Sequence, residues 1–140
     1  MTEDDITRKQ AMFWERGPAG LVLCRLCHQQ CAIAEGRRGV CGVRENRGGV
    51  LYSLVYGRVT AESSDPVEKK PLYHVLPGSR VYSIATRGCN FRCLHCQNCT
   101  ISQVSPDDDL TDDRRVRPAH IVRNVHAVGR AGIAYTYTKP

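Results

Sequence analysis

Two apolar segments in the second half of the chain predict β-strands on either side of a helix. Residues 80–86 form a short apolar run that predicts a buried strand, and residues 133–137 predict another strand. The helix is expected over residues 118–128, where four apolar side chains share one face: Ile121, Val122, Val125 and Val128. Strand, helix and strand in this order predict one βαβ unit with parallel strands, so we expect an α/β fold.

The first half of the chain is less regular. Residues 50–60 are rich in β-forming side chains and predict a strand or hairpin arm with a bulge at Gly57, and residues 62–70 predict a polar connector. Residues 21–49 hold five glycines and four cysteines, which favours a loop-rich metal-binding knuckle over a helix or a sheet. We therefore divide the chain into three segments: a tail at 1–20, a Cys-rich metal-binding and β region at 21–79, and an α/β segment at 80–140.

Composition and charge narrow the class of protein. The 140 residues are 41% hydrophobic and 24% charged, as in a soluble globular protein, and no apolar run is long enough to span a bilayer. The N-terminus lacks the charged-then-apolar order of a signal peptide, so we expect a cytoplasmic protein without a membrane partner.

The net charge of +6 comes mostly from arginine. Several arginines lie around one segment, which we interpret as a solvated loop partly neutralised by Glu35 and Glu45: Arg37, Arg38, Arg44 and Arg47. The positive charge would suit an acidic protein partner. Nucleic acid is not expected as a partner, because the sequence lacks the aromatic stacking pattern of single-strand binders.

All eight cysteines fall into two groups, which points to metal binding. Thiols stay reduced in the cytosol, and clustered cysteines without an export signal bind metal more often than they form disulfides. One group begins with Cys89, Cys93 and Cys96, spaced C-x3-C-x2-C directly after the strand expected at 80–86. Three thiolates can hold three irons of a [4Fe–4S] cluster and leave the fourth iron open for another ligand. Zinc also binds thiolates, but the count of three and the preceding strand favour iron.

The other group has the spacing C-x2-C-x3-C-x9-C and consists of four cysteines: Cys24, Cys27, Cys31 and Cys41. Four thiolates can close a tetrahedral zinc site or hold a second [4Fe–4S] cluster. The sequence leaves both metals open. A closed site has no vacant position, so its expected role is structural or electron-relaying, and metal binding would fold this glycine-rich loop.

The triplet resembles the signature of radical S-adenosylmethionine (SAM) enzymes. The chain is similar, in order, to one branch of that superfamily, the AmmeMemoRadiSam system radical SAM enzymes, which are related to the pyruvate formate-lyase activating enzyme. The similar segments cover much of residues 12–140: 41–46, 51–58, 68–74, 77–80, 96–98 and 133–137. The resemblance implies an incomplete radical SAM partial (β/α) barrel, of which residues 80–140 are the first βαβ unit, preceded by a small Cys-rich, β-containing metal-binding region.

The resemblance also implies the cofactors and the reaction. Cys89, Cys93 and Cys96 match the three cluster ligands, and SAM would chelate the open iron. One electron from the reduced cluster then releases a 5′-deoxyadenosyl radical that abstracts hydrogen from a substrate. Thr138 and Lys139 match the positions that bind SAM. The family implies a flavodoxin or ferredoxin-type electron donor.

The sequence departs from this branch at three positions. His95 replaces an aromatic residue before the third cysteine, and Cys99 stands where the branch has tryptophan. Cys99 is either a small buried residue or a fourth ligand that would close the cluster. Lys139 replaces a glutamate that contacts the methionyl ammonium, which would place a cation against a cation.

Competence of this short chain for catalysis is therefore in doubt. A partial barrel of this kind has more strands than the two expected here, so we expect apolar sheet surface that leads to poor solubility or oligomerisation. Residues that would contact the substrate are expected in later strands, so the substrate is unknown. The alternative function is a non-catalytic zinc or iron–sulfur module that binds an acidic partner.

Overall fold

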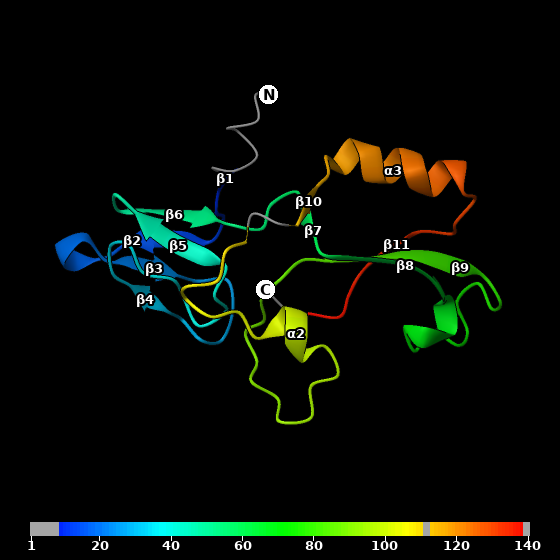
Figure 1. The fold of residues 1–140 in the computed structure, drawn as a ribbon, viewed down its shortest axis with the longest axis horizontal. Helices are drawn as coiled ribbons and strands as arrows, with labels where there is room; N and C mark the ends of the chain where they lie inside the picture. The colour runs from blue at the N-terminus through cyan, green and yellow to red at the C-terminus, as the bar shows by residue number, and fades with distance from the viewer. Residues whose placement is uncertain (1–8, 111–112, 139–140) are drawn as a thin grey trace. The chain divides into compact units, whose positions relative to one another are not determined.

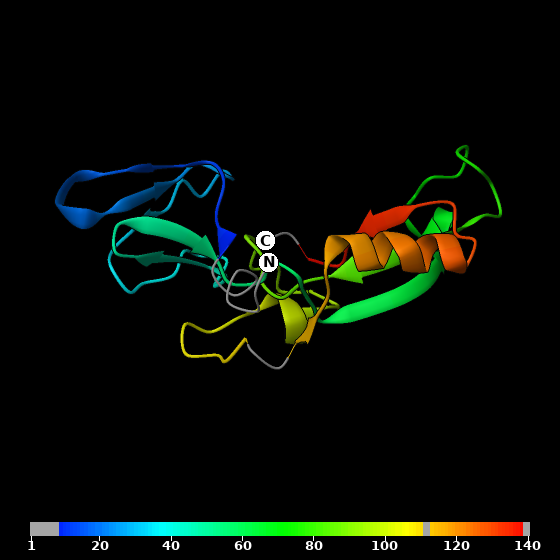
Figure 2. The same cartoon turned by 90° about the horizontal axis from the view of Figure 1, so that it is seen from above.

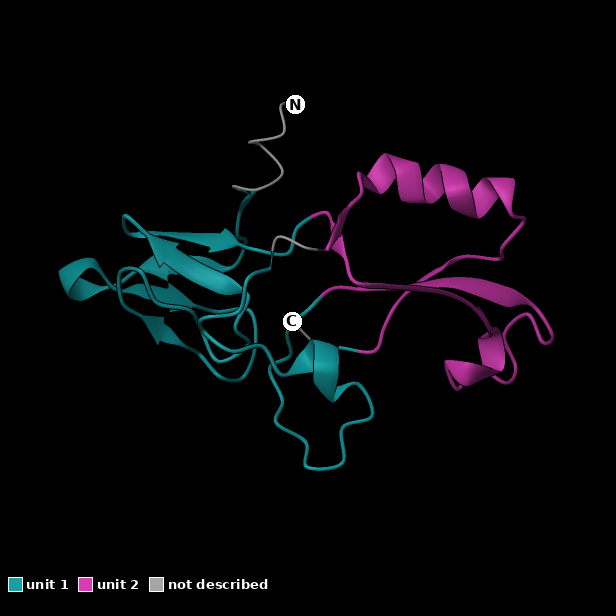
Figure 3. Cartoon of the chain, in the orientation of Figure 1, with its two compact units in different colours: residues 1–56, 87–112, 138–140 teal, residues 57–86, 113–137 magenta. Residues whose placement is uncertain are grey.

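The computed structural model describes residues 9–110 and 113–138, which fall into two compact units (Figures 1 and 3). Among these residues, the first unit contains 9–56, 87–110 and Thr138, and the second contains 57–86 and 113–137. The units do not follow the segments expected at 21–79 and 80–140. Residues 87–110, which carry the cysteine triplet, belong to the same unit as the other cysteine group.

The first unit contains two small antiparallel sheets. One has the order β2-β3-β4, from strands Trp14–Arg16, Val22–Cys24 and Ala32–Ile33. The other has the order β1-β6-β5, from strands Lys9–Gln10, Val50–Ser53 and Arg44–Arg47. A 3-10 turn, η1 (Pro18–Gly20), connects β2 to β3. Most of residues 21–49 are loops and turns, as expected, but β3, β4 and β5 also lie there, so the expectation that the segment contains no sheet is wrong.

Two apolar clusters stabilise this unit. The first joins both sheets and consists of Ala11, Val22, Cys24, Ile33 and Leu51. The second holds the segments after β6 and after the short helix α2 (Cys99–Ser102), and consists of Val43, Val55, Val104 and Leu110. Asn46 is fully buried in β5 and donates from Nδ2 to the carbonyls of Gly20 and Ile33, at 2.9 and 2.8 Å. Buried polar groups need such partners, so Asn46 fixes the backbone around the first cluster.

The strand expected over 50–60 is two strands. Strand β6 ends at Ser53, and β7 covers only Arg58–Val59. Gly57 lies in the turn between them with φ of +67°, a conformation that glycine adopts without strain, so it is not a bulge within one strand.

The second unit contains the expected βαβ arrangement. Strand β9 (Arg80–Ala85) pairs in parallel with β11 (Ile133–Tyr135), and helix α3 (Pro118–Ala127) lies between them in sequence. Figures 1 and 2 show α3 running alongside these strands. The strands and helix expected at 80–86, 133–137 and 118–128 are confirmed, with ends that differ by one to two residues.

Other details of the second unit differ from the expectations. The connector expected at 62–70 is strand β8 (Ala61–Pro66), antiparallel to β9, followed by the 3-10 turn η2 (Val67–Lys69). Strand β10 (Arg114–Arg115) pairs with β7. Of the four apolar side chains expected to share one face of the helix, Ile121 and Val125 are buried, while Val122 and Val128 are exposed.

The apolar core of the second unit consists of Ile121 and Val125 together with Val59, Ile84 and Val116.

None of the helices within residues 9–110 and 113–138 has both the length and the apolar character that crossing a bilayer requires.

Candidate metal centres

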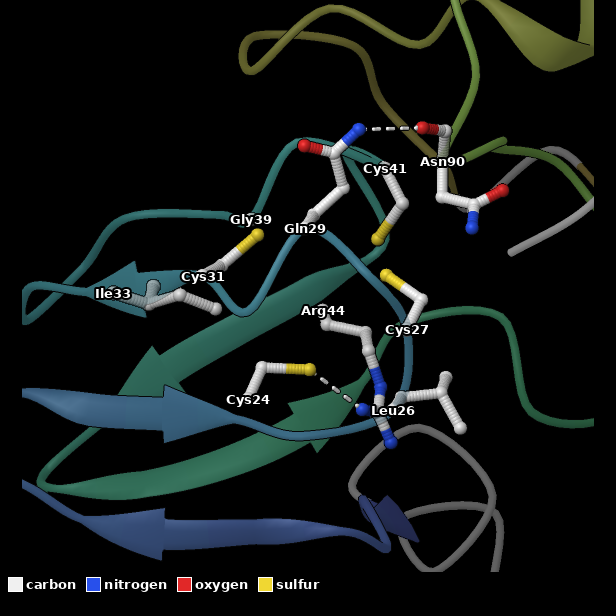
Figure 4. Close-up of a pocket in the computed structure, with 10 residues that line it drawn as sticks. All are labelled: Cys24, Leu26, Cys27, Gln29, Cys31, Ile33, Gly39, Cys41, Arg44 and Asn90. Atoms are coloured by element: carbon white, nitrogen blue, oxygen red, sulfur yellow. Dashed lines mark hydrogen bonds between the residues drawn. The ribbon is translucent and has the colours of Figure 1, made fainter.

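The first cysteine group (Cys24, Cys27, Cys31 and Cys41) lines one pocket. Cys24 ends β3, Cys31 precedes β4, and the backbone N–H of Cys24 donates to the carbonyl of Cys31 at 2.9 Å. This hydrogen bond closes the hairpin that carries Cys27 at its tip. Figure 4 shows the four cysteines around one space, with the sulfur atoms of Cys27 and Cys41 pointing toward each other. The structure therefore brings together all four residues of this predicted site.

The chemical state of these cysteines fits metal binding. All eight cysteines lie within the described residues, and none of them forms a disulfide. The four thiols nevertheless do not converge on one ion: within residues 9–110 and 113–138, no three His, Cys, Asp or Glu side chains are close enough together to hold one. The pocket is a site of four free thiols arranged around a common space.

Arg44 supplies a buried positive charge to this pocket. Its side chain lines the pocket and is only 7% exposed. Nη1 donates to Sγ of Cys24 at 2.9 Å, and Nη2 donates to the carbonyl of Met12 at 2.6 Å. A buried charge is costly without a partner of opposite sign, so this arginine favours a negatively charged centre. The interpretation of Arg44 as part of a solvated loop is wrong.

The environment of Cys41 changes the pKa of its thiol. Burial raises the pKa of the Cys41 thiol above its usual value, and the neighbouring Cys24 and Cys31 raise that pKa further. The Val43 N–H and Arg44 act in the opposite direction. Thiolates held this close repel each other, and a bound cationic metal centre would relieve that repulsion.

The cysteine triplet (Cys89, Cys93 and Cys96) lies in the loop after β9, which we call the triplet loop (residues 88–98). Cys89 is buried, Cys96 is half-buried and Cys93 is exposed. The backbone N–H of Phe91 donates to Sγ of Cys89 at 3.4 Å, and Sγ of Cys96 lies 3.2 Å from Oγ of Ser102. Hydrogen bonds to sulfur stabilise thiolate ligands, so these contacts fit an iron–sulfur site. The three sulfurs share one loop but are not gathered around a single ion.

The two cysteine groups lie next to each other. Asn90 of the triplet loop lines the pocket of the first group, and its carbonyl accepts a hydrogen bond from Nε2 of Gln29 at 3.0 Å. The rings of His28 and Phe91 are 5.4 Å apart between centroids. Gly88 packs so closely on the Cys41 segment that a Cβ added to it would lie 2.7 Å from the Cys41 carbonyl oxygen.

The remaining predicted positions are less defined. Cys99 and His95 are both exposed. Cys99 is therefore not the small buried residue that was one of its two expected roles. Thr138 is half-buried after β11, while Lys139 lies outside the described residues.

A buried carboxylate, Asp65, holds the segment after β11 in the second unit. Asp65 is 3% exposed and accepts from the Ser83 hydroxyl at 2.6 Å and from Lys70 Nζ at 2.7 Å. The Tyr137 hydroxyl donates to the same carboxylate oxygen, and Lys70 Nζ lies 4.6 Å from the centre of the Tyr137 ring. Tyr137 is thereby fixed next to Thr138, despite a positive φ of 71° that non-glycine residues rarely adopt.

Sequence reasoning missed Arg44 and Asp65 as site residues. Alternation along β5 places Arg44 and Asn46 on the inner face, but polar side chains at inner positions give no hydrophobic signal. Asp65 and Tyr137 are 72 residues apart in sequence, so no local pattern connects them.

Comparison with known proteins finds a similar archaeal protein. The chain is 48% identical over 132 residues to an uncharacterized protein of Methanocaldococcus jannaschii, an alignment that covers 94% of this chain and 39% of the relative. The chain thus spans about two fifths of the length of that curated relative. No family model and no solved structure matches the chain.

Proposed function

We propose that the chain is an iron–sulfur protein of the radical SAM type, in which Cys89, Cys93 and Cys96 hold a [4Fe–4S] cluster. One observation carries the proposal. Three free cysteines spaced C-x3-C-x2-C begin four residues after the end of β9, and β9, α3 and β11 form a parallel βαβ unit. Three ligands leave one iron for SAM, which a closed four-cysteine site would not do.

The cluster and SAM supply the difficult chemistry, namely one-electron cleavage of the sulfonium to a 5′-deoxyadenosyl radical. The residues of this chain bind and orient the cluster and SAM. Phe91 N–H and the Ser102 hydroxyl support two ligand sulfurs, and the Asp65–Tyr137 hydrogen bond fixes the backbone next to Thr138, which we propose contacts SAM. We further propose a cytoplasmic location and a flavodoxin or ferredoxin-type electron donor.

Iron content of matched cysteine variants tests this proposal. The full chain is reconstituted anaerobically with iron and sulfide, and iron and acid-labile sulfide are counted in wild type, Cys93→Ala and Cys99→Ser. We expect Cys93→Ala to bind about four irons fewer than wild type. Cys99→Ser is expected to keep the wild-type count, because an exposed Cys99 is not a ligand in this proposal. Unchanged iron in Cys93→Ala, or the loss of about four irons in Cys99→Ser, would contradict it.

A further inference from the structure

We infer that Ser102 raises the reduction potential of the proposed triplet cluster through a hydrogen bond to Cys96, and that Gln103 and Arg92 fix the direction of this bond. The inference rests on the proposed function, because Cys96 is one of the proposed cluster ligands. Ser102 contacts a ligand sulfur directly, whereas Gln103 and Arg92 are positioning residues that act through Ser102.

Ser102 is held in a buried position beside Cys96. It ends helix α2 and is 1% exposed. Its backbone N–H donates at 2.9 Å to the carbonyl of Asn98, the last residue of the triplet loop. Gly88, the first residue of that loop, donates from its N–H to the carbonyl of Ile101 at 2.9 Å. Both ends of the triplet loop are therefore attached to α2, and Oγ of Ser102 lies 3.2 Å from Sγ of Cys96.

Arg92 settles which atom donates in each hydrogen bond of this group. Arginine has N–H donors and no acceptor, so the atom of Gln103 that lies 2.7 Å from Nη1 of Arg92 is the amide oxygen, Oε1. The amide nitrogen Nε2 then faces Oγ of Ser102 at 3.1 Å, and Nε2 can only donate. Because Oγ accepts from Gln103, the hydroxyl hydrogen of Ser102 is left to donate to Sγ of Cys96.

The guanidinium of Arg92 is itself fixed at a second point. Nη2 donates to the carbonyl of Val40 at 2.7 Å, and Val40 directly precedes Cys41. Nε2 of Gln103 also lies 3.4 Å from the carbonyl of Phe91, which gives its second hydrogen an acceptor. The amide of Gln103 is thus held on both sides and does not turn over, so it keeps the Ser102 hydroxyl pointed at the sulfur.

A hydroxyl that donates to a ligand sulfur favours the reduced form of a cluster. Reduction adds one electron, and a hydrogen bond to a more negative acceptor is stronger. Hydrogen bonds to the sulfurs are one of the means by which a protein sets the potential of an iron–sulfur cluster. Loss of the Ser102 hydroxyl should therefore make the potential more negative. It should leave the iron count unchanged, because Ser102 is not a ligand.

Reduction potentials of matched variants test the inference. Wild type, Ser102→Ala, Gln103→Met, the double variant and Thr100→Ala are produced as full chains and reconstituted anaerobically with iron and sulfide. Each is titrated with dithionite in the presence of redox mediators. The triplet cluster is followed by electron paramagnetic resonance, as the signal that Cys93→Ala lacks. Thr100→Ala is the control, because it removes a hydroxyl from an exposed position of the same helix.

We expect Ser102→Ala to keep the wild-type iron count and to titrate at a more negative potential than wild type. Gln103→Met should shift the potential in the same direction but by less, because the hydroxyl remains and is no longer fixed. The double variant should titrate with Ser102→Ala, since Gln103 acts only through Ser102. Thr100→Ala should titrate with wild type.

The outcomes separate this inference from the triplet proposal. A wild-type potential in Ser102→Ala with its iron intact would overturn the inference and leave the triplet proposal standing. Shifts that add in the double variant would overturn the positioning role of Gln103. If Ser102→Ala does not retain its cluster, Gln103→Met decides, and a wild-type potential there contradicts the inference. Wild-type iron in Cys93→Ala would instead overturn the triplet proposal itself.

Discussion

At the scale of single residues, Arg44 has the clearest energetic consequence. Its guanidinium is buried between Sγ of Cys24 and the carbonyl of Met12, and it connects β5 to the segment before β2. Hydrogen bonds that involve a charged group contribute more to stability than neutral ones. Arg44 therefore stabilises the first unit.

We expect Arg44→Met to lower the free energy of unfolding by about 1.5–3 kcal/mol, because it removes two charge-assisted hydrogen bonds from a buried position. Arg47→Met is the matched control. Arg47 is an exposed arginine of the same strand that pairs with Glu45, and its loss should cost under about 1 kcal/mol. Urea unfolding at pH 7 under reducing conditions measures the free energy of unfolding of both variants. Equal losses in the two variants would show that the burial of Arg44 adds nothing to stability.

Asp65 predicts a dependence of stability on pH. Burial opposes its ionisation, but hydrogen bonds from Lys70, Ser83, Tyr137 and Lys69 outweigh burial and hold the pKa of Asp65 well below its usual range. The unfolded chain therefore binds more protons than the folded chain as the pH falls below about 4. The stability that Asp65 contributes is fully present above that pH and is lost as the pH falls toward its lowered folded pKa.

Asp65→Asn should accordingly destabilise the protein at pH 7 by about 1.5–3 kcal/mol, with a difference from wild type that shrinks below about pH 4. The exposed Asp107→Asn serves as the control. Unfolding free energies measured from pH 7 down to the acid transition test this. A difference between Asp65→Asn and wild type that stays constant over that range would contradict the assignment of charge to Asp65.

At the scale of elements, the approach of the triplet loop to the Cys41 segment depends on Gly88. Gly88 has φ of +89°, and an added Cβ would lie 2.5 Å from Cγ1 of Val43 and 2.7 Å from the Cys41 carbonyl oxygen. Both distances are shorter than carbon atoms tolerate, so one of the two segments would have to move.

Gly88→Ala is therefore expected to reduce iron incorporation and to destabilise the first unit by more than Gly48→Ala does. Gly48 also has a positive φ, +62°, but nothing lies within 4 Å of an added Cβ. The control thus carries the backbone strain of about 1–2 kcal/mol without the clash. Iron counts and urea unfolding measure both variants, and equal results would mean that the close contact is not required.

The elements differ in how far the sequence predicts them. Strand β9 and helix α3 have enough residues for an apolar period to emerge, and both are confirmed near the expected positions. The strands of the Cys-rich region have two to four residues each, and β5 turns Arg44 and Asn46 inward. Such short strands with polar inner positions have no detectable period, which is why the sheets of residues 21–49 were not predicted.

At the scale of the whole molecule, the sequence predicts which cysteines belong together better than it predicts contacts between distant segments. Cysteine spacing identifies both groups, and the structure brings Cys24, Cys27, Cys31 and Cys41 to one pocket as predicted. The placement of the triplet loop beside that pocket depends on contacts between residues about 60 positions apart, such as Gln29 and Asn90. A local sequence pattern carries no information on contacts between residues this far apart in the chain. The proximity of the two cysteine groups is therefore seen only in the folded structure.

The central claim is that Cys89, Cys93 and Cys96 leave one iron of a cluster open to SAM. Electron paramagnetic resonance (EPR) spectroscopy of the dithionite-reduced Cys27→Ala chain, recorded with and without SAM, tests it most directly, because this variant lacks one cysteine of the first group and keeps the whole triplet. We expect SAM to change the g-values of the cluster signal and Cys93→Ala to lack that change. A signal that is identical with and without SAM would mean that no iron is open, and would contradict the account.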